Sequence, residues 1–98
     1  MKLEIAFRPE AEKEFREAIS WYARQKKGLG KRFAAAVRQA LKRLRSLPRL
    51  HSIVISDVRR AIVKGFPYVI LYRVTASEIV VLAVFHTKRD PGDWHDRV

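Results

Sequence analysis

The sequence contains no cysteine, and only four prolines and four glycines occur among its 98 residues. Without cysteine there is no disulfide framework, no thiolate zinc site and no cysteine nucleophile. No apolar stretch approaches the roughly 20 residues that a membrane-spanning helix needs, and no apolar signal-peptide core follows Met1. We therefore expect a cytoplasmic protein in which residues 1–98 form a single domain, without a metal or cofactor.

Acidic residues are scarce in the middle of the chain. The chain has 21 lysines and arginines and 10 aspartates and glutamates, which gives a formal net charge of +11. Residues 24–64 carry thirteen basic side chains and one acidic side chain, whereas residues 1–23 have a net charge of −1 and residues 65–98 a net charge of 0. A basic surface of this density favours an anionic partner, either nucleic acid or an acidic protein segment.

The first half of the chain changes from strand-like to helical spacing. Residues 3–7 alternate between apolar and polar or small side chains, which predicts a short strand. Apolar residues then recur every three or four positions over residues 11–22 and again over residues 33–47, which predicts two helices. The short Gly28-Leu29-Gly30 segment between them predicts a tight connection, so the two helices should form an antiparallel hairpin that ends at Pro48.

The second half is rich in Val, Ile, Tyr and Phe. Residues 58–64, 68–74 and 79–85 predict three strands joined by hairpin turns. The last two strands are apolar on both faces, so both faces of the sheet centre need a cover: the helical hairpin is one, and a partner chain is a candidate for the other. The predicted fold is therefore α+β: a short N-terminal strand at a sheet edge, an antiparallel helical hairpin, and a three-stranded antiparallel meander forming one sheet.

Six short motifs follow one another along almost the whole chain. They are Pro9-Glu10-Ala11-Glu12, Trp21-Tyr22, Gly28-Leu29-Gly30-Lys31-Arg32-Phe33, Val58-Arg59-Arg60, Phe66-Pro67-Tyr68 with Leu71-Tyr72-Arg73, and His86-Thr87-Lys88-Arg89-Asp90-Pro91 with Trp94. In this order and spacing they resemble the RelE/ParE superfamily of toxins from type II toxin–antitoxin systems. The resemblance implies the RelE/ParE fold and one of two activities: RelE-like members cleave messenger RNA on the ribosome, and ParE-like members inhibit DNA gyrase. It also implies a cognate antitoxin with an acidic, partly disordered segment that neutralises the toxin.

The RelE-like alternative, an endoribonuclease, requires a base, an acid and cations that stabilise the phosphate in the transition state. Cations on one face of strand 58–64 would meet the ends of the next two strands if those ends lie in one cleft. The candidate catalytic residues of this alternative are therefore Arg60, Lys64, Arg73 and His86. RelE-like members generally have a tyrosine or a His-Tyr pair near the C-terminus, whereas residues 94–98 of this chain contain no tyrosine.

Several of these residues also have a structural interpretation. Arg60 and Lys64 fit solvated positions or contacts to an acidic antitoxin, an interpretation that we prefer to catalysis. The segment from His86 to Trp94 predicts a C-terminal clasp in which Arg89 pairs with a carboxylate and Trp94 packs. Aromatic stripes on a strand are usually core, although a tyrosine at the edge of a face could stack on a base. The candidate contacts to antitoxin or target are Arg32, Arg38, Arg59, Arg60, Lys64, Tyr72, Arg89 and Trp94.

The leading hypothesis is a ParE-like toxin without catalytic activity that inhibits gyrase and is neutralised by its antitoxin. It depends on the Gly28-Leu29-Gly30 hairpin and on the missing C-terminal tyrosine. Under the RelE-like alternative, the partners would be the ribosome and messenger RNA. Direct binding of nucleic acid by the basic surface is a third hypothesis.

Overall fold

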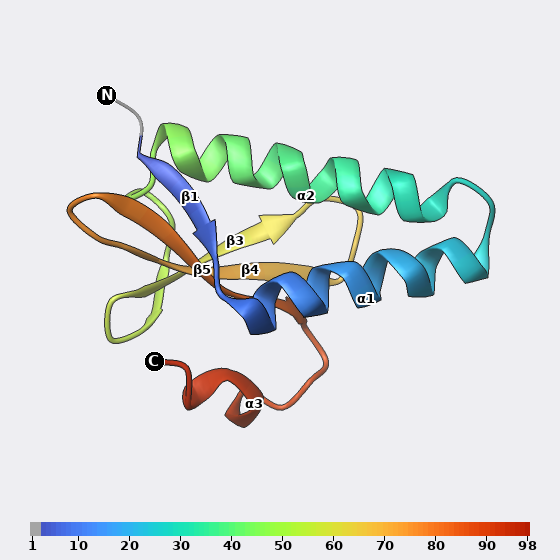
Figure 1. Cartoon of the computed structure of the whole chain (residues 1–98). Coiled ribbons are helices and arrows are strands. Elements are labelled where there is room, and N and C mark those ends of the chain that lie inside the picture. The colour runs from blue at the N-terminus through green and yellow to red at the C-terminus, as the bar shows by residue number, and fades with distance from the viewer. Residues whose placement is uncertain (1–2) are drawn as a thin grey trace.

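The computed structural model describes residues 3–98 and contains one mixed five-stranded sheet with helices on both faces (Figure 1). The elements are β1 (Glu4–Phe7), α1 (Pro9–Gln25), α2 (Leu29–Ser46), β2 (Ile53–Ile55), β3 (Val58–Val63), β4 (Tyr68–Val74), β5 (Glu78–His86) and α3 (Gly92–His95). The strand order is β1-β5-β4-β3-β2, in which β1 pairs in parallel with β5 and all other neighbours are antiparallel.

The predicted α+β class, the helical hairpin and the β3–β4–β5 meander are confirmed, but the sheet is not a three-stranded antiparallel one. The N-terminal strand occupies a sheet edge as predicted, and its parallel pairing with β5 makes the sheet mixed. Strand β2 was missed because three residues are too short to show a period. Its pairing with β3 is also interrupted by a bulge, which precedes a left-handed residue, Ser56, with φ of 52°.

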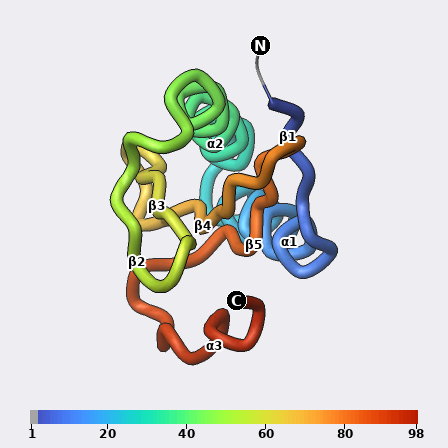
Figure 2. Tube along the Cα trace, turned by 90° about the vertical axis from the view of Figure 1, so that its left-hand side faces the viewer, coloured from blue at the N-terminus to red at the C-terminus, as the bar shows by residue number. Residues whose placement is uncertain are grey.

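The hairpin of α1 and α2 covers one face of the sheet (Figures 1 and 2). Gly28, between the two helices, has a left-handed conformation with φ of 81°. The predicted connection was too long, however, because α2 begins at Leu29 and Gly30 lies inside the helix. A Cβ atom at Gly30 would lie 2.7 Å from the backbone oxygen of Ile19, so this glycine permits close packing of the two helices.

The core between the hairpin and the sheet is apolar and contains an aromatic cluster. Phe33 of α2 is fully buried, and its ring centroid lies 4.9 to 5.1 Å from those of Tyr22, Phe66 and Tyr68. Aliphatic side chains of α2 and the central strands continue this core toward the other end of the hairpin. They include Val37, Leu44, Val63, Ile70, Ile79 and Val81.

The C-terminal segment packs against the opposite face of the sheet (Figure 2). Trp94 of α3 is 7% exposed and meets Phe85 edge to face, with ring centroids 6.3 Å apart. The other buried members of this second cluster are Val58, Val69, Leu71, Leu82 and Ala83. Over this cluster, therefore, the second cover of the sheet is the chain's own C-terminus rather than a partner chain. Among residues 3–98, no helix is both long and apolar enough to cross a membrane.

Candidate functional site

The most prominent concave surface lies where the second half of α2 meets the outer part of the sheet. Two pockets of about 550 and 380 Å³ adjoin there, since both are lined by Arg43, Leu50 and His51. We call their combined surface the basic groove. Its lining residues are Gln39, Lys42, Arg43, Ser46, Leu47, Leu50, His51, Ser52, Arg60, Ile62 and Lys64.

Hydrogen bonds hold the connection between α2 and β2 in place as one wall of the groove. The guanidinium of Arg59 donates to the backbone oxygens of Arg49 and His51, at 2.9 and 2.7 Å. The hydroxyl of Tyr72 donates to the backbone oxygen of Pro48 at 2.7 Å. These bonds fix the backbone around Leu50, so its exposed side chain belongs to a defined surface.

The groove combines apolar side chains with uncompensated positive charge. Leu50 is 76% exposed and Ile62 61% exposed, values that are high for large apolar side chains. None of the lining residues is acidic, and four are cationic: Lys42, Arg43, Arg60 and Lys64. The ring atom Nδ1 of His51 is buried without a hydrogen-bond partner among the described residues. Such a surface suits a partner that is both acidic and apolar.

The four candidate catalytic residues do not lie in one pocket. Arg60 and Lys64 both line the basic groove, as the alternation over residues 58–64 predicts, although β3 itself ends at Val63. Arg73 binds Asp57, with its Nε 3.0 Å from both carboxylate oxygens. His86 pairs with Tyr68 in the register of β4 and β5, whereas Arg73 pairs with Val80. Five residues of extended strand, about 17 Å, therefore separate Arg73 from the position opposite His86.

His86 belongs to a second pocket of about 480 Å³ at the other end of β4, the aromatic pocket. It is lined by Trp21, Tyr22, Pro67, Tyr68, His86 and Arg89. The Nδ1 atom of His86 accepts a hydrogen bond from the backbone N–H of Lys88 at 3.0 Å, so this nitrogen acts as an acceptor. Burial raises the pKa of the Tyr22 hydroxyl and is also the main reason that the pKa of Tyr68 is raised. Both phenols therefore stay protonated at neutral pH.

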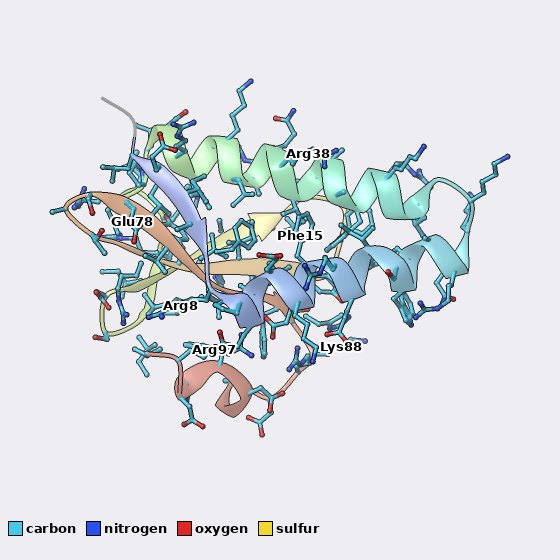
Figure 3. All side chains as sticks on the ribbon, in the orientation of Figure 1. Arg8, Phe15, Arg38, Glu78, Lys88 and Arg97 are labelled. Carbon is cyan, nitrogen blue, oxygen red and sulfur yellow. The ribbon has the colours of Figure 1, made fainter. Side chains whose placement is uncertain are left out.

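The predicted C-terminal clasp is confirmed, and its strongest contact involves a residue that the sequence analysis did not select. Arg89 lies 3.4 Å from carboxylate oxygens of both Glu14 and Asp93. Arg97 makes the shorter contact, because its two terminal nitrogens each lie 2.9 Å from an oxygen of Glu14. Arg97 lies between α1 and α3 (Figure 3). This hydrogen bonding to Glu14 is the largest cause of the raised pKa of Arg97.

The Glu14–Arg97 pair also satisfies the backbone of β5 beyond the end of β1. Strand β1 ends opposite Val81, and past that point the Glu14 carboxylate accepts the N–H of Val84 at 3.2 Å. Arg97 donates to the backbone oxygen of Leu82 at 3.1 Å. One side-chain pair thus takes the place of a neighbouring strand. A signal was present in the sequence, because Glu14 lies on the apolar stripe of α1, where a carboxylate needs a partner.

The remaining predicted contact residues divide between core and surface. Tyr72 is fully buried, and burial raises its pKa to about 12, so its side chain is part of the core and is not presented to a partner. Trp94 and Arg59 likewise serve the fold in the contacts described above. Arg32 and Arg38 are exposed on α2 outside the groove. Among residues 3–98, no cluster of three or more His, Cys, Asp or Glu side chains could hold a metal ion.

Comparisons with known proteins agree with this fold. The family described as the ParE toxin of the type II toxin–antitoxin system parDE matches residues 5–91. A solved structure of the chromosomal ParDE toxin–antitoxin system from P. aeruginosa superposes with a TM-score of 0.72 and 16% sequence identity, covering 89% of this chain and 98% of that one. A structure of the YoeB dimer from Staphylococcus aureus gives a TM-score of 0.60 and 16% identity, covering 86% and 95%.

The two structural matches are distant in sequence, so they establish the fold alone. A search of curated proteins by sequence found no match. The family match spans nearly all the elements described above, from β1 to the residue before α3. This chain therefore belongs to the ParE toxin family of type II toxin–antitoxin systems.

Proposed function

We propose that this ParE-family toxin inhibits DNA gyrase in the cytoplasm and that its cognate antitoxin neutralises it by docking in the basic groove. Family membership supports the first part of the proposal. The basic groove carries the second part, because it is the one place among the described residues where a concave surface, exposed leucines and clustered cations coincide.

The side chains that line the groove favour an acidic, apolar protein segment over a second copy of this chain as its occupant. Leu47, Leu50 and Ile62 offer apolar anchor points, while Arg60 and Lys64 flank them with positive charge. An acidic and apolar segment that orders on binding satisfies both features at once. A second copy of this chain fits poorly if its own groove faces this one, because cations would then oppose cations.

Cleavage of messenger RNA is the alternative, and it has weaker support. The likeness to YoeB concerns the fold. Arg60 and Lys64 could still contact a phosphate together, but Arg73 pairs with Asp57 and His86 lies in the aromatic pocket. Residues 94–98 contain no tyrosine. A general acid and a phosphate-binding cation pair are therefore not assembled at one place.

A supercoiling assay tests gyrase inhibition. We expect the purified toxin to block supercoiling by gyrase, and the co-expressed antitoxin to restore it. Unchanged supercoiling at toxin concentrations that arrest growth would overturn this part of the proposal. Primer extension on translated messages serves as the parallel measurement, since codon-positioned cuts that vanish in Lys64→Ala would support RNA cleavage instead.

Charge reversal in the groove tests antitoxin docking. The double variant Arg60→Glu/Lys64→Glu should weaken antitoxin binding by about 100-fold or more, because two favourable charge contacts become repulsive. The matched control is Lys13→Glu/Arg24→Glu, which changes the net charge equally on the exposed side of α1. Binding is measured by titration calorimetry. An equal loss in both variants would mean that overall charge, and not the groove, attracts the antitoxin.

A further inference from the structure

The exposed side of α2 has a second basic surface, which differs from the groove because it lacks exposed large apolar side chains. It consists of Lys31, Arg32, Arg38 and Lys42, and we call it the basic stripe; only Lys42 is shared with the groove. No acidic residue occurs in α2. Within residues 3–98, these four side chains form no ion pair and no hydrogen bond. Long side chains ending in nitrogen extend from this helix away from α1 (Figure 3).

Helical geometry places three of these cations along a nearly straight line, with Arg32 beside its first member. Lys31, Arg38 and Lys42 are separated by seven and four residues, so at 100° per residue they lie within about 40° of one another around the helix. The line is about 16 Å long, since each residue advances the helix by 1.5 Å. Duplex DNA presents one phosphate charge per roughly 1.7 Å of its axis, so a line of this length faces several phosphates.

The first turn of α2 adds to the positive potential. Its N-terminal end carries no acidic residue, although the helix dipole favours carboxylates there. Lys31 and Arg32 instead place cations at the positive end of the dipole, an arrangement that is unfavourable in isolation. An external anion would offset this repulsion.

The composition of the stripe distinguishes between anionic partners. No large apolar side chain of α2 is exposed, so a peptide would find no anchor of the kind that the groove offers. No aromatic side chain is exposed on α2 either, and surfaces for single-stranded nucleic acid normally provide such stacking platforms. The stripe is therefore a row of cations on one helix. The small, exposed Ala35 between Lys31 and Arg38 leaves room for a phosphate backbone to approach the helix closely.

We propose that the basic stripe binds the phosphate backbone of double-stranded DNA without reading its sequence. This interaction is separate from antitoxin docking in the groove, and it requires neither gyrase nor the antitoxin. Phosphate contacts of this kind position a protein on a duplex and carry no direct sequence information. The toxin would thereby be held on the same polymer on which a topoisomerase acts.

Fluorescence anisotropy with a labelled 20-base-pair duplex tests the proposal. Four phosphate contacts predict a slope of log affinity against log salt near −3.6, so affinity should fall about 150-fold between 50 and 200 mM salt. Lys31→Gln/Arg38→Gln should reduce the slope to about −1.8. Arg32→Gln/Lys42→Gln should have the same effect, which guards against a folding defect in either variant. The matched control Lys13→Gln/Arg24→Gln, on α1, should leave the slope unchanged.

Each of the following results would overturn the proposal. One is no detectable binding at 50 mM salt, and another is an affinity that does not respond to salt. A third is an equal change of slope in the α1 control, which would indicate attraction by net charge alone. The last is equal or tighter binding of a single strand of the same length. None of these results bears on gyrase inhibition, because the supercoiling assay reports that activity independently.

Discussion

The two faces of the sheet are covered in different ways. On one face, α1 and α2 contribute 17 and 18 residues, and several large side chains between them and the sheet are fully buried. On the other face, the four-residue α3 contributes a single large apolar side chain, Trp94. The first cover is stabilised by extended apolar contact. The second depends on a few specific contacts, namely Trp94 and the Glu14–Arg97 pair.

Truncating the centre of the first face should have the largest effect. Phe33→Ala removes a fully buried ring from the aromatic cluster, and we expect it to lower the free energy of unfolding by about 4 kcal/mol. Urea denaturation measures the change. A loss below about 1 kcal/mol would contradict the view that extended apolar contact stabilises this face.

Truncating the second face should cost less. Trp94→Ala should lower the free energy of unfolding by about 3 kcal/mol, since the small α3 can relax into the space left by the indole. Trp94→Phe serves as the control, and it should recover most of the loss because an aromatic ring still contacts Phe85. If Trp94→Ala proved as costly as Phe33→Ala, the contrast between the faces would disappear.

Neutralising Glu14 tests whether the ion pair holds the C-terminal segment. The side chains of Glu14 and Arg97 are only 12% and 17% exposed, so Glu14→Gln leaves a poorly solvated guanidinium without its anion. We expect a loss of about 2 kcal/mol in unfolding free energy, together with faster hydrogen exchange at Val84. Glu17→Gln, an exposed change on the same helix, should have almost no effect.

The smallest effect at neutral pH concerns Tyr72. Tyr72→Phe removes its hydrogen bond to Pro48 and should cost about 1 kcal/mol. Because the folded pKa of Tyr72 is raised to about 12, its contribution is fully present below pH 10 and is lost as the pH rises from 10 toward 12. Denaturation at pH 9 and pH 11.5 should therefore show a smaller loss of stability in Tyr72→Phe than in the unmodified chain. An identical loss in both would contradict the assignment.

Local patterns predicted most of the fold, including the β3–β4–β5 meander, but not the pairings of β1 and β2. Helical spacing identified α1 and α2 because their apolar stripes are long, and β-rich runs identified β3, β4 and β5. β2 has only three residues, which is too few for a period to be visible. The parallel position of β1 beside β5 depends on contacts between segments more than 70 residues apart, and no local pattern contains that information.

The candidate site was also predicted only in part, because local patterns do not contain the strand register. Alternation along one strand correctly grouped Arg60 with Lys64. The grouping of Arg73 with His86 was wrong because it assumed that neighbouring strand ends meet. The register places Arg73 near one end of β4, whereas His86 of β5 lies opposite Tyr68 at the other end. Leu47 and Leu50, which give the groove its apolar character, follow α2 and become part of a defined surface only when Arg59 and Tyr72 anchor that connection.

The sequence by itself determined the strong positive charge of residues 24–64, the periods of the helices and strands, and the motifs that resemble the RelE/ParE superfamily. Each is a local property of neighbouring residues. Tertiary structure alone decided that Lys42 and Arg43 join Arg60 and Lys64 in one groove, which end of the sheet carries His86, and that the C-terminus covers the second face. These outcomes depend on strand register and on contacts such as Glu14 with Arg97, 83 residues apart, whose free energy arises only when the chain is folded.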